Sequence, residues 1–167
     1  LIALSLVLGA VSASAAEYKI DPSHSTVGFR IKHLVGKVPG RFDKFSGKLN
    51  YAPGDAKTWS VEADIDPASV NTANEKRDAH LRNADFFDVE KCPEMKFKST
   101  SVTESKLKGE LTLHCVTKPV ELDLEIGGVT KDPWGNERAG FSAKGKLKRK
   151  DFGIEWNKTL DAGGVML

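Results

Sequence analysis

Three residues near the start of the chain have the chemistry of a hydrolase triad. They are Asp21, His24 and Ser25, which offer a carboxylate, an imidazole and a hydroxyl within a short segment. Adjacent residues on a strand point to opposite faces, so His24 is badly placed to activate Ser25. The sequence also lacks the G-x-S-x-G pattern that presents a nucleophilic serine. We therefore expect turn and strand-start hydrogen bonds here, with a small hydrolase or isomerase as an alternative.

The four histidines do not form a metal-binding pattern. They are scattered along the chain without H-E-x-x-H or H-x₃-H spacing, at His24, His33, His80 and His114. Residues 140–146 match G-x₄-G-K, but they lack the following Ser or Thr and lie in a predicted strand rather than before a helix. We expect no metal and no cofactor.

The two cysteines, Cys92 and Cys115, are predicted to pair. Strands over 94–102 and 107–115, joined by a short hairpin loop, bring them close together. They fall two residues out of register, an offset that a bulge or a longer loop can absorb. In an exported protein such a pair is oxidised. We expect a disulfide, worth about 3 kcal/mol through the loop that it closes, rather than two buried thiols.

The composition is that of one folded domain. The chain has 167 residues, with 25 basic and 23 acidic side chains, so its formal charge is only +2. That balance argues against a protein built mainly to bind nucleic acid. Apolar residues make up 40% and charged residues 29%, a mix typical of a globular chain rather than a disordered one.

The two ends of the chain differ from its middle. Residues 1–16 carry no charge and pass from an apolar stretch to small residues, which predicts a signal peptide cleaved after Ala16. The run is shorter than the roughly 20 residues of a membrane span, although a short anchor is the alternative. Because it starts without Met or a basic segment, we expect a partial leader, and a mature domain over 17–167. Val165 is predicted to begin a last strand that is cut short.

Between these ends the dominant period is two, the spacing of strands. Each strand has one apolar and one charged face, as in an antiparallel sheet with one solvated side. With an eighth strand from Val165, the pattern predicts an all-β fold, an extended eight-stranded antiparallel barrel without sheet edges. Such a barrel is filled by side chains or holds one small ligand. The seven strands are predicted from alternation over residues 27–31, 45–51, 59–65, 95–97, 107–115, 120–126 and 141–147.

One segment breaks the period of two. A capping box that begins with Thr72 as N-cap predicts a short crossover helix over about 73–83, lying on a barrel mouth or edge. Arg77 and His80 share a face of this helix and offer donors for an anionic or polar head group. The alternative is that Arg77 and Asp78 tie the helix to the barrel rim. We favour that role for Asp78 and leave both roles open for Arg77 and His80.

A series of motifs runs in order through the mature chain. Together they resemble the YceI-like polyisoprenoid-binding family, whose members are exported bacterial proteins with a lipocalin-like barrel around an isoprenoid lipid. Cys115 stands where that family usually has Gly, and Cys92 where it often has Tyr, and a disulfide explains both departures. The motifs include Tyr18-x-Ile20-Asp21-x-x-His24-Ser25-x-Val27-x-Phe29, Arg77-Asp78-x-His80-Leu81, Asp85-Phe86-Phe87-Asp88-Val89, Val116-Thr117-Lys118-Pro119-Val120 and Asp151-Phe152-Gly153.

The resemblance implies two sets of ligand-binding residues. Polar candidates for the head group are His24, His33, Arg77 and His80. The apolar tunnel is expected to be lined by Val27, Phe29, Ile31, Phe42, Phe45, Phe97, Leu111, Leu113, Leu122, Leu124 and Phe141.

The expected function is therefore binding, storage or transport of a polyprenyl phosphate or an isoprenoid quinone in a bacterial periplasm. Burial of one isoprene unit contributes at most about 4 kcal/mol to the free energy of binding. A few units therefore suffice for binding without any catalytic residue, so we do not expect an enzyme. The alternative is a structural or stress-response interaction protein whose barrel is filled. The partners considered are the lipid, a transient membrane-surface contact and a second copy paired through an edge strand, with no nucleic acid.

Overall fold

The computed structural model describes residues 15–158. Almost all of the predicted leader, and the predicted strand at Val165, lie outside this range. Within it the chain forms ten strands and one α-helix, α1 (Glu75–Arg82), with short 3₁₀ turns η1 (Ala56–Thr58), η2 (Pro67–Ser69) and η3 (Arg149–Phe152). The strands are β1 (Ala16–Lys19), β2 (Val27–His33), β3 (Gly36–Phe42), β4 (Phe45–Tyr51), β5 (Ser60–Ile65), β6 (Val70–Asn71), β7 (Met95–Val102), β8 (Lys106–Leu113), β9 (Val116–Lys131) and β10 (Glu137–Lys144).

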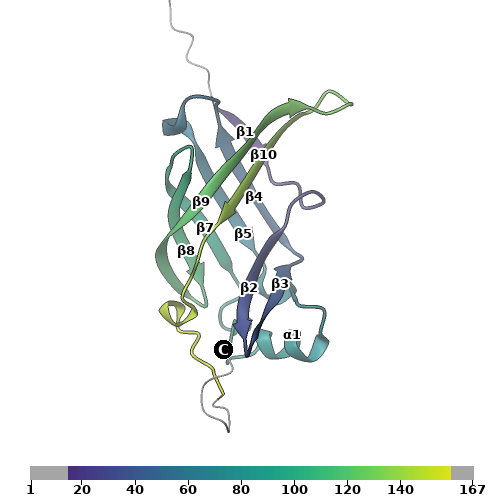
Figure 1. Ribbon diagram of the computed structural model, residues 1–167, viewed down its shortest axis with the longest axis vertical. Helices are drawn as coiled ribbons and strands as arrows, with labels where there is room; N and C mark the ends of the chain where they lie inside the picture. The colour runs from purple at the N-terminus through teal and green to yellow at the C-terminus, as the bar shows by residue number, and fades with distance from the viewer. Residues whose placement is uncertain (1–14, 159–167) are drawn as a thin grey trace, which may run out of the picture.

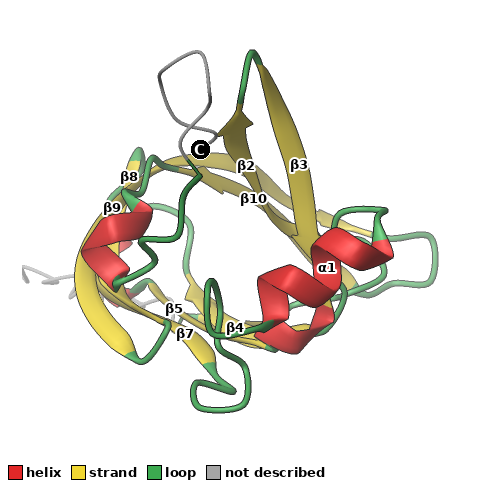
Figure 2. Cartoon of the chain, turned by 90° about the horizontal axis from the view of Figure 1, so that it is seen from below, coloured by secondary structure: helices red, strands yellow, loops and turns green. Residues whose placement is uncertain are grey.

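The strands form two antiparallel sheets that curve around one axis. The larger sheet has the order β1-β4-β5-β7-β8-β9-β10, and the smaller has the order β2-β3-β6. Figure 1 shows the elongated barrel, and Figure 2 shows the strands, α1 and η3 arranged around its lower end. The prediction of an antiparallel barrel with one helix is confirmed. Residues 15–158 form ten strands where seven were expected, and the eighth expected strand lies outside this range.

The strands that alternation did not reveal are β1, β3 and β6. β3 contains Gly36, Pro39 and Gly40, which resemble turn residues in the sequence. Pro39 pairs with Arg30 of β2, while β6 pairs only with Arg41 and Phe42 on the other side. The missing N–H of Pro39 therefore costs the sheet no hydrogen bond to a third strand.

Two inward glycines, Gly40 and Gly109, make room for aromatic rings rather than for a ligand. Gly40 lies opposite Phe29, and a Cβ atom at Gly40 would collide with the Phe29 ring. A Cβ atom at Gly109 would likewise lie against the ring of Phe97 and the backbone of Lys98. Small inward residues are thus explained by packing across the strands, and they do not by themselves indicate a cavity.

The helix begins two residues later than the capping box predicts. Asn74 is the N-cap, and its side chain accepts a hydrogen bond from the backbone N–H of Arg77. Thr72 is not the cap, because Ala73 adopts a left-handed conformation with φ 59° and turns the chain before the helix starts. The Thr72 backbone N–H and hydroxyl instead donate to Oδ1 of buried Asp78, at 2.9 and 2.5 Å. The predicted anchoring role of Asp78 is therefore found.

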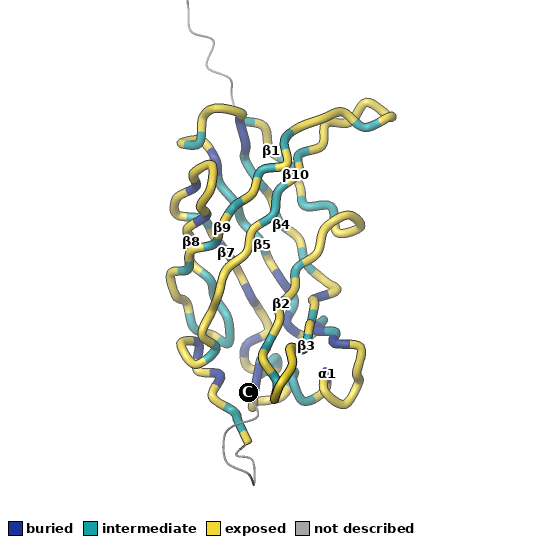
Figure 3. The backbone as a smooth tube through the Cα atoms, in the orientation of Figure 1, coloured by how far each residue is buried: buried dark blue, intermediate teal, exposed yellow. Residues whose placement is uncertain are grey.

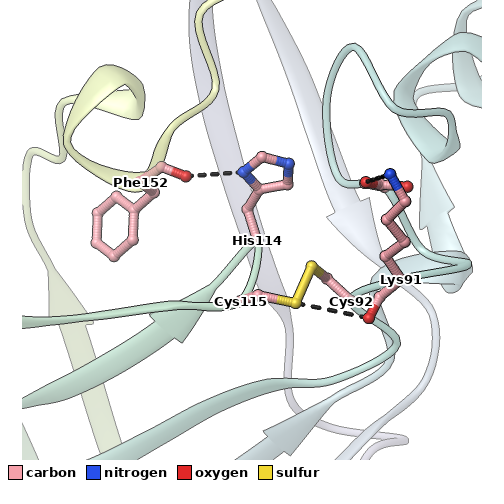
Figure 4. The surroundings of a disulfide bond; sticks show 6 residues. Lys91, Cys92, His114, Cys115 and Phe152 are labelled. Carbon is pink, nitrogen blue, oxygen red and sulfur yellow. Dashed lines mark hydrogen bonds and ion pairs between the residues drawn. A yellow bond between two sulfur atoms is a disulfide. The ribbon is translucent and has the colours of Figure 1, made fainter.

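The disulfide between Cys92 and Cys115 is present, with the two Cα atoms 5.3 Å apart (Figure 4). Of the two expected ways to absorb the offset, a bulge or a longer loop, the structure shows a register shift between Ser99 and Ser101 of β7. His114 and Cys115 form the two-residue turn between β8 and β9, with φ values of 54° and 58°. Both therefore occupy the left-handed region that glycine adopts most easily.

Candidate functional site

The interior of the barrel contains two apolar clusters. The upper cluster, at the β1 end of Figure 1, contains Tyr51, Trp59, Phe97, Val102 and Leu107 as its buried members. The lower cluster, at the α1 end, contains Phe42, Ile65, Val70 and Met95. Leu111 of β8 packs against both clusters. The apolar interior is therefore continuous from one end of the barrel to the other.

Most of the inner wall is half-buried. Of the eleven predicted tunnel residues, Phe42 and Phe97 are buried and the rest have intermediate exposure. All except Ile31 belong to one of the two clusters or pack against it. Along β2 and β9, half-buried inward residues alternate with exposed outward ones (Figure 3). The inward apolar rows are thus gathered together but remain partly accessible, unlike the core of a tightly filled barrel.

Aromatic side chains line both parts of this interior. In the lower cluster the ring of Phe42 lies 5.7 Å from that of Phe29 and 5.6 Å from that of Phe87. In the upper cluster the ring of Tyr51 lies 4.8 Å from Trp59 and 5.0 Å from Phe141. Such rings give a large apolar contact area with little conformational freedom to lose.

The sequence analysis missed part of this wall. Val120 and Ile126 lie in the same inward row of β9 as the predicted Leu122 and Leu124, so the period of two already contained the signal. Phe87, which follows α1, could not be placed in the interior by periodicity because it lies in a loop.

The two edge strands of the larger sheet meet through side chains. β1 and β10 do not pair through their backbones in the part of the chain that the structure describes. Instead the Tyr18 hydroxyl donates a hydrogen bond to the Glu137 carboxylate, and Arg138 Nη1 lies 3.3 Å from Asp21 Oδ2. The hydrogen bond to Glu137 raises the pKa of Tyr18 to about 12. The barrel wall is therefore closed here by side-chain contacts alone.

The residues of the suspected triad do not form a proton relay. His24 Nδ1 lies 2.8 Å from Asp21 Oδ2 and 2.9 Å from the hydroxyl of Ser23, not of Ser25. A relay needs one ring nitrogen for the carboxylate and the other for the nucleophile, whereas both contacts here use the same nitrogen. Hydrogen bonds from Ser23 and then His24 hold the pKa of Asp21 well below its ordinary value. The expected turn hydrogen bonds are therefore found.

Two polar candidates on α1 are engaged in structural contacts. Arg77 donates from Nε to the Thr72 hydroxyl at 2.7 Å and from Nη2 to the Thr72 carbonyl at 2.9 Å. His80 Nε2 lies 2.8 Å from Asp85 Oδ2, and its ring packs edge-on against Phe86 and Trp156. These contacts match the anchoring alternative for Arg77.

The four polar candidates do not gather at one point. His24 lies in the loop between β1 and β2, while the other three belong to elements at the lower end (Figure 1). His33 is half-buried at the last position of β2. Among residues 15–158 no cluster of His, Cys, Asp and Glu is suited to hold a metal ion. In the same range no helix is long and apolar enough to cross a membrane.

Comparison with known proteins assigns the chain to a family. Residues 18–166 match the family described as the YceI-like domain. The chain belongs to the YceI-like family. It is 46% identical over 158 residues to a UPF0312 protein of Photorhabdus laumondii, covering 90% of this chain and 82% of that protein. It is 44% identical over 158 residues to protein YceI of Escherichia coli O157:H7, covering 90% and 83%.

Solved structures share the YceI-like fold. The YCEI protein of Campylobacter jejuni, at 42% identity, superposes with a TM-score of 0.66 over 81% of this chain and 83% of its own. BcnA of Burkholderia cenocepacia is similar in fold, with a TM-score of 0.68 at 22% identity over 80% and 83%. A domain from Saccharophagus degradans, described as polyisoprenoid binding, gives 0.50 at 20% identity over 66% and 68%.

Proposed function

We propose that this YceI-like protein binds an isoprenoid lipid, a polyprenyl phosphate or an isoprenoid quinone, inside its barrel. The observation that carries the proposal is the continuous, half-buried apolar wall that Leu111 joins across the two clusters. A partly accessible apolar surface of this extent is costly unless something covers it. A long, flexible hydrocarbon with methyl branches can contact the half-buried aliphatic and aromatic side chains along this wall.

We infer that the protein stores or carries this lipid without changing it. Burial of a few isoprene units, at about 0.8 kcal/mol for each carbon, offsets an association cost of about 4–15 kcal/mol. Affinity therefore needs no chemical step. The arrangement of His24, Asp21 and Ser23 supports a turn rather than a catalytic relay. The description of the Saccharophagus degradans domain as polyisoprenoid binding supports the choice of ligand class.

We also propose export to a bacterial periplasm. The disulfide between Cys92 and Cys115 forms readily in an oxidising compartment and is rare in a reducing one. The apolar leader predicted over residues 1–16 supports the same destination.

To test this proposal, a larger side chain is introduced where the two apolar clusters meet. Leu111→Trp should abolish uptake of a fluorescent polyprenyl analogue, because the larger ring occupies the space between the clusters. The matched control is Glu110→Trp, which places the same side chain on the exposed outer face of the neighbouring position. Far-UV circular dichroism checks that both variants are folded. Equal uptake by the two variants would contradict binding in the barrel and favour a filled barrel with an interaction role.

A further inference from the structure

The hairpin formed by β2 and β3 presents two apolar side chains at its tip. Leu34 is 42% exposed and Val35 is fully exposed at 107%. Leu34 has φ 53°, a left-handed conformation that glycine adopts at lower cost. The tip projects at the lower end of the barrel (Figure 1), and the view from below shows it well away from α1 (Figure 2). Both features disfavour a large apolar residue here in a protein that meets only water.

The same hairpin is rich in cations, of which only Arg41 has an acidic ion-pair partner, Asp43, among the described residues. From Pro22 to Phe42 the chain has four Lys and Arg residues and no Asp or Glu. Lys32 lies directly opposite Lys37 in the sheet, and both are exposed. Like charges in such a cross-strand pair repel and destabilise the hairpin. Neither they nor Arg30 form an ion pair within residues 15–158.

On the outer face of the larger sheet, lysines form ion pairs with glutamates of neighbouring strands. Lys98 lies 3.4 Å from Glu62, and Lys106 and Lys108 lie 3.3 and 3.2 Å from Glu121. These rows place opposite charges on neighbouring strands, as expected for a solvated sheet. The hairpin of β2 and β3 therefore departs from a rule that the larger sheet follows.

A second basic segment lies at the same end of the barrel. β10 runs downward and continues into η3 at the lower left of Figure 1. Over residues 144–150 every position is basic except Gly145 and Leu147, and Leu147 is 46% exposed. Two separate segments at one end thus combine exposed aliphatic side chains with cations, most of which form no ion pair within residues 15–158.

We propose that this lower end docks on the surface of an anionic phospholipid bilayer. Leu34 and Val35 would enter the interface between head groups and acyl chains, and the surrounding lysines and Arg30 would contact the lipid phosphates. Peripheral proteins bind membranes through this combination of small apolar insertions and cations. The repulsion between Lys32 and Lys37 would be relieved by the negative surface potential of such a bilayer.

A bilayer fits these residues better than a protein partner does. The exposed apolar area consists of Leu34 and Val35 at a narrow tip and Leu147 on the second segment, without the aromatic anchors that centre protein interfaces. The inward row of β2, formed by Val27, Phe29 and Ile31, runs from the interior to this tip. Docking would therefore bring the apolar interior to the membrane from which a lipid is drawn, although docking itself does not require the proposed cargo.

Flotation with vesicles that contain no isoprenoid tests the proposal. The full mature protein should bind vesicles of phosphatidylglycerol and phosphatidylcholine, bind pure phosphatidylcholine far more weakly, and lose affinity as salt rises. Each cation near an anionic surface contributes roughly fivefold in affinity. The double variant Lys32→Gln/Lys37→Gln should therefore bind about 30-fold more weakly, and Val35→Ser should also weaken binding.

The upper end supplies matched controls. Lys57→Gln/Lys131→Gln removes the same charge from η1 and from the tip of β9, and Trp134→Ser removes an 83% exposed apolar residue. These variants should bind vesicles as the unmodified protein does. Equal losses in test and control variants, equal binding to both vesicle types, or binding to double-stranded DNA without binding to vesicles would overturn the proposal. Because the vesicles lack isoprenoid, failure here leaves the uptake experiment on Leu111→Trp unaffected.

Discussion

The hydroxyl of Tyr18 in β1 donates a hydrogen bond to the carboxylate of Glu137 in β10. These two strands are the edges of the seven-stranded sheet, so the contact joins the edges without a backbone ladder. The neighbouring ion pair between Asp21 and Arg138 supports the same junction. Closure by side chains leaves this junction easier to open than the backbone-paired strands within each sheet.

The Tyr18 contact predicts a titration at high pH. The pKa of Tyr18 is raised to about 12, chiefly by its hydrogen bond to Glu137. In Glu137→Gln it should fall toward the ordinary value of about 10, as measured by tyrosinate absorbance, with Tyr18→Phe identifying the signal. Because the folded-state pKa is the higher one, the contribution to stability is present below pH 10 and declines as pH rises toward 12. An unchanged titration in Glu137→Gln would show that the carboxylate does not hold the hydroxyl.

The turn at His114 and Cys115 predicts an order of stability among variants without the disulfide. The φ value of Cys115 is 58°, which a glycine adopts more easily than a serine. Cys92→Ser/Cys115→Gly should therefore be about 1 kcal/mol more stable than Cys92→Ser/Cys115→Ser. Both should be less stable than the oxidised protein by about 2–4 kcal/mol. Urea unfolding measures the three values, and the reverse order of the two double variants would contradict the account of the turn.

The anchoring of α1 predicts a loss of stability at Asp78. This buried carboxylate accepts two hydrogen bonds from Thr72. Asp78→Ala leaves the buried N–H and hydroxyl without their acceptor, which should cost about 1–3 kcal/mol in the free energy of unfolding. Glu75→Ala, at an exposed position of the same helix, is the control and should change stability by less than about 1 kcal/mol. A cost at Asp78 no larger than the control would remove it as the anchor.

The polar candidates at the lower end should separate into binding and structural residues. His33→Ala should weaken uptake of a polyprenyl phosphate by about two- to tenfold, the equivalent of one hydrogen bond of about 0.5–1.5 kcal/mol, without changing the thermal midpoint. Arg77→Ala should instead lower stability, because its guanidinium holds the hydroxyl and carbonyl of Thr72. Calorimetric titration and thermal unfolding of both variants make the comparison. The opposite assignment of effects would place the head group on α1 rather than beside His33.

Periodicity predicted most of the barrel because one face of each strand meets water and the other meets the interior. It failed at β3, where Pro39 and Gly40 hide a paired strand, and Gly40 is small because the Phe29 ring lies above it. It also misplaced the start of α1, because Ala73 makes a left-handed turn and Thr72 bonds to Asp78 instead of capping the helix. The hydrogen bond between Thr72 and Asp78 forms only in the folded loop, so the spacing of the residues in the sequence does not reveal it.

The residues of the candidate site were likewise predicted from the sequence only in part. Alternation predicted inward residues such as Leu122 and Leu124 correctly, since the strand period fixes which side they face. Phe87 was not found, because it reaches the lower cluster from a loop. The contact of His24 with Ser23 was also not predicted, since the turn places Ser23, and not Ser25, beside the imidazole ring.

Mass spectrometry of the bound lipid tests the central claim most directly. The full mature protein would be purified from a bacterial periplasm without detergent and extracted with organic solvent. Our account predicts one polyprenyl or quinone molecule for each chain, lost in Leu111→Trp and retained in Glu110→Trp. An extract without isoprenoid, together with no uptake of added ubiquinone or polyprenyl phosphate, would contradict it.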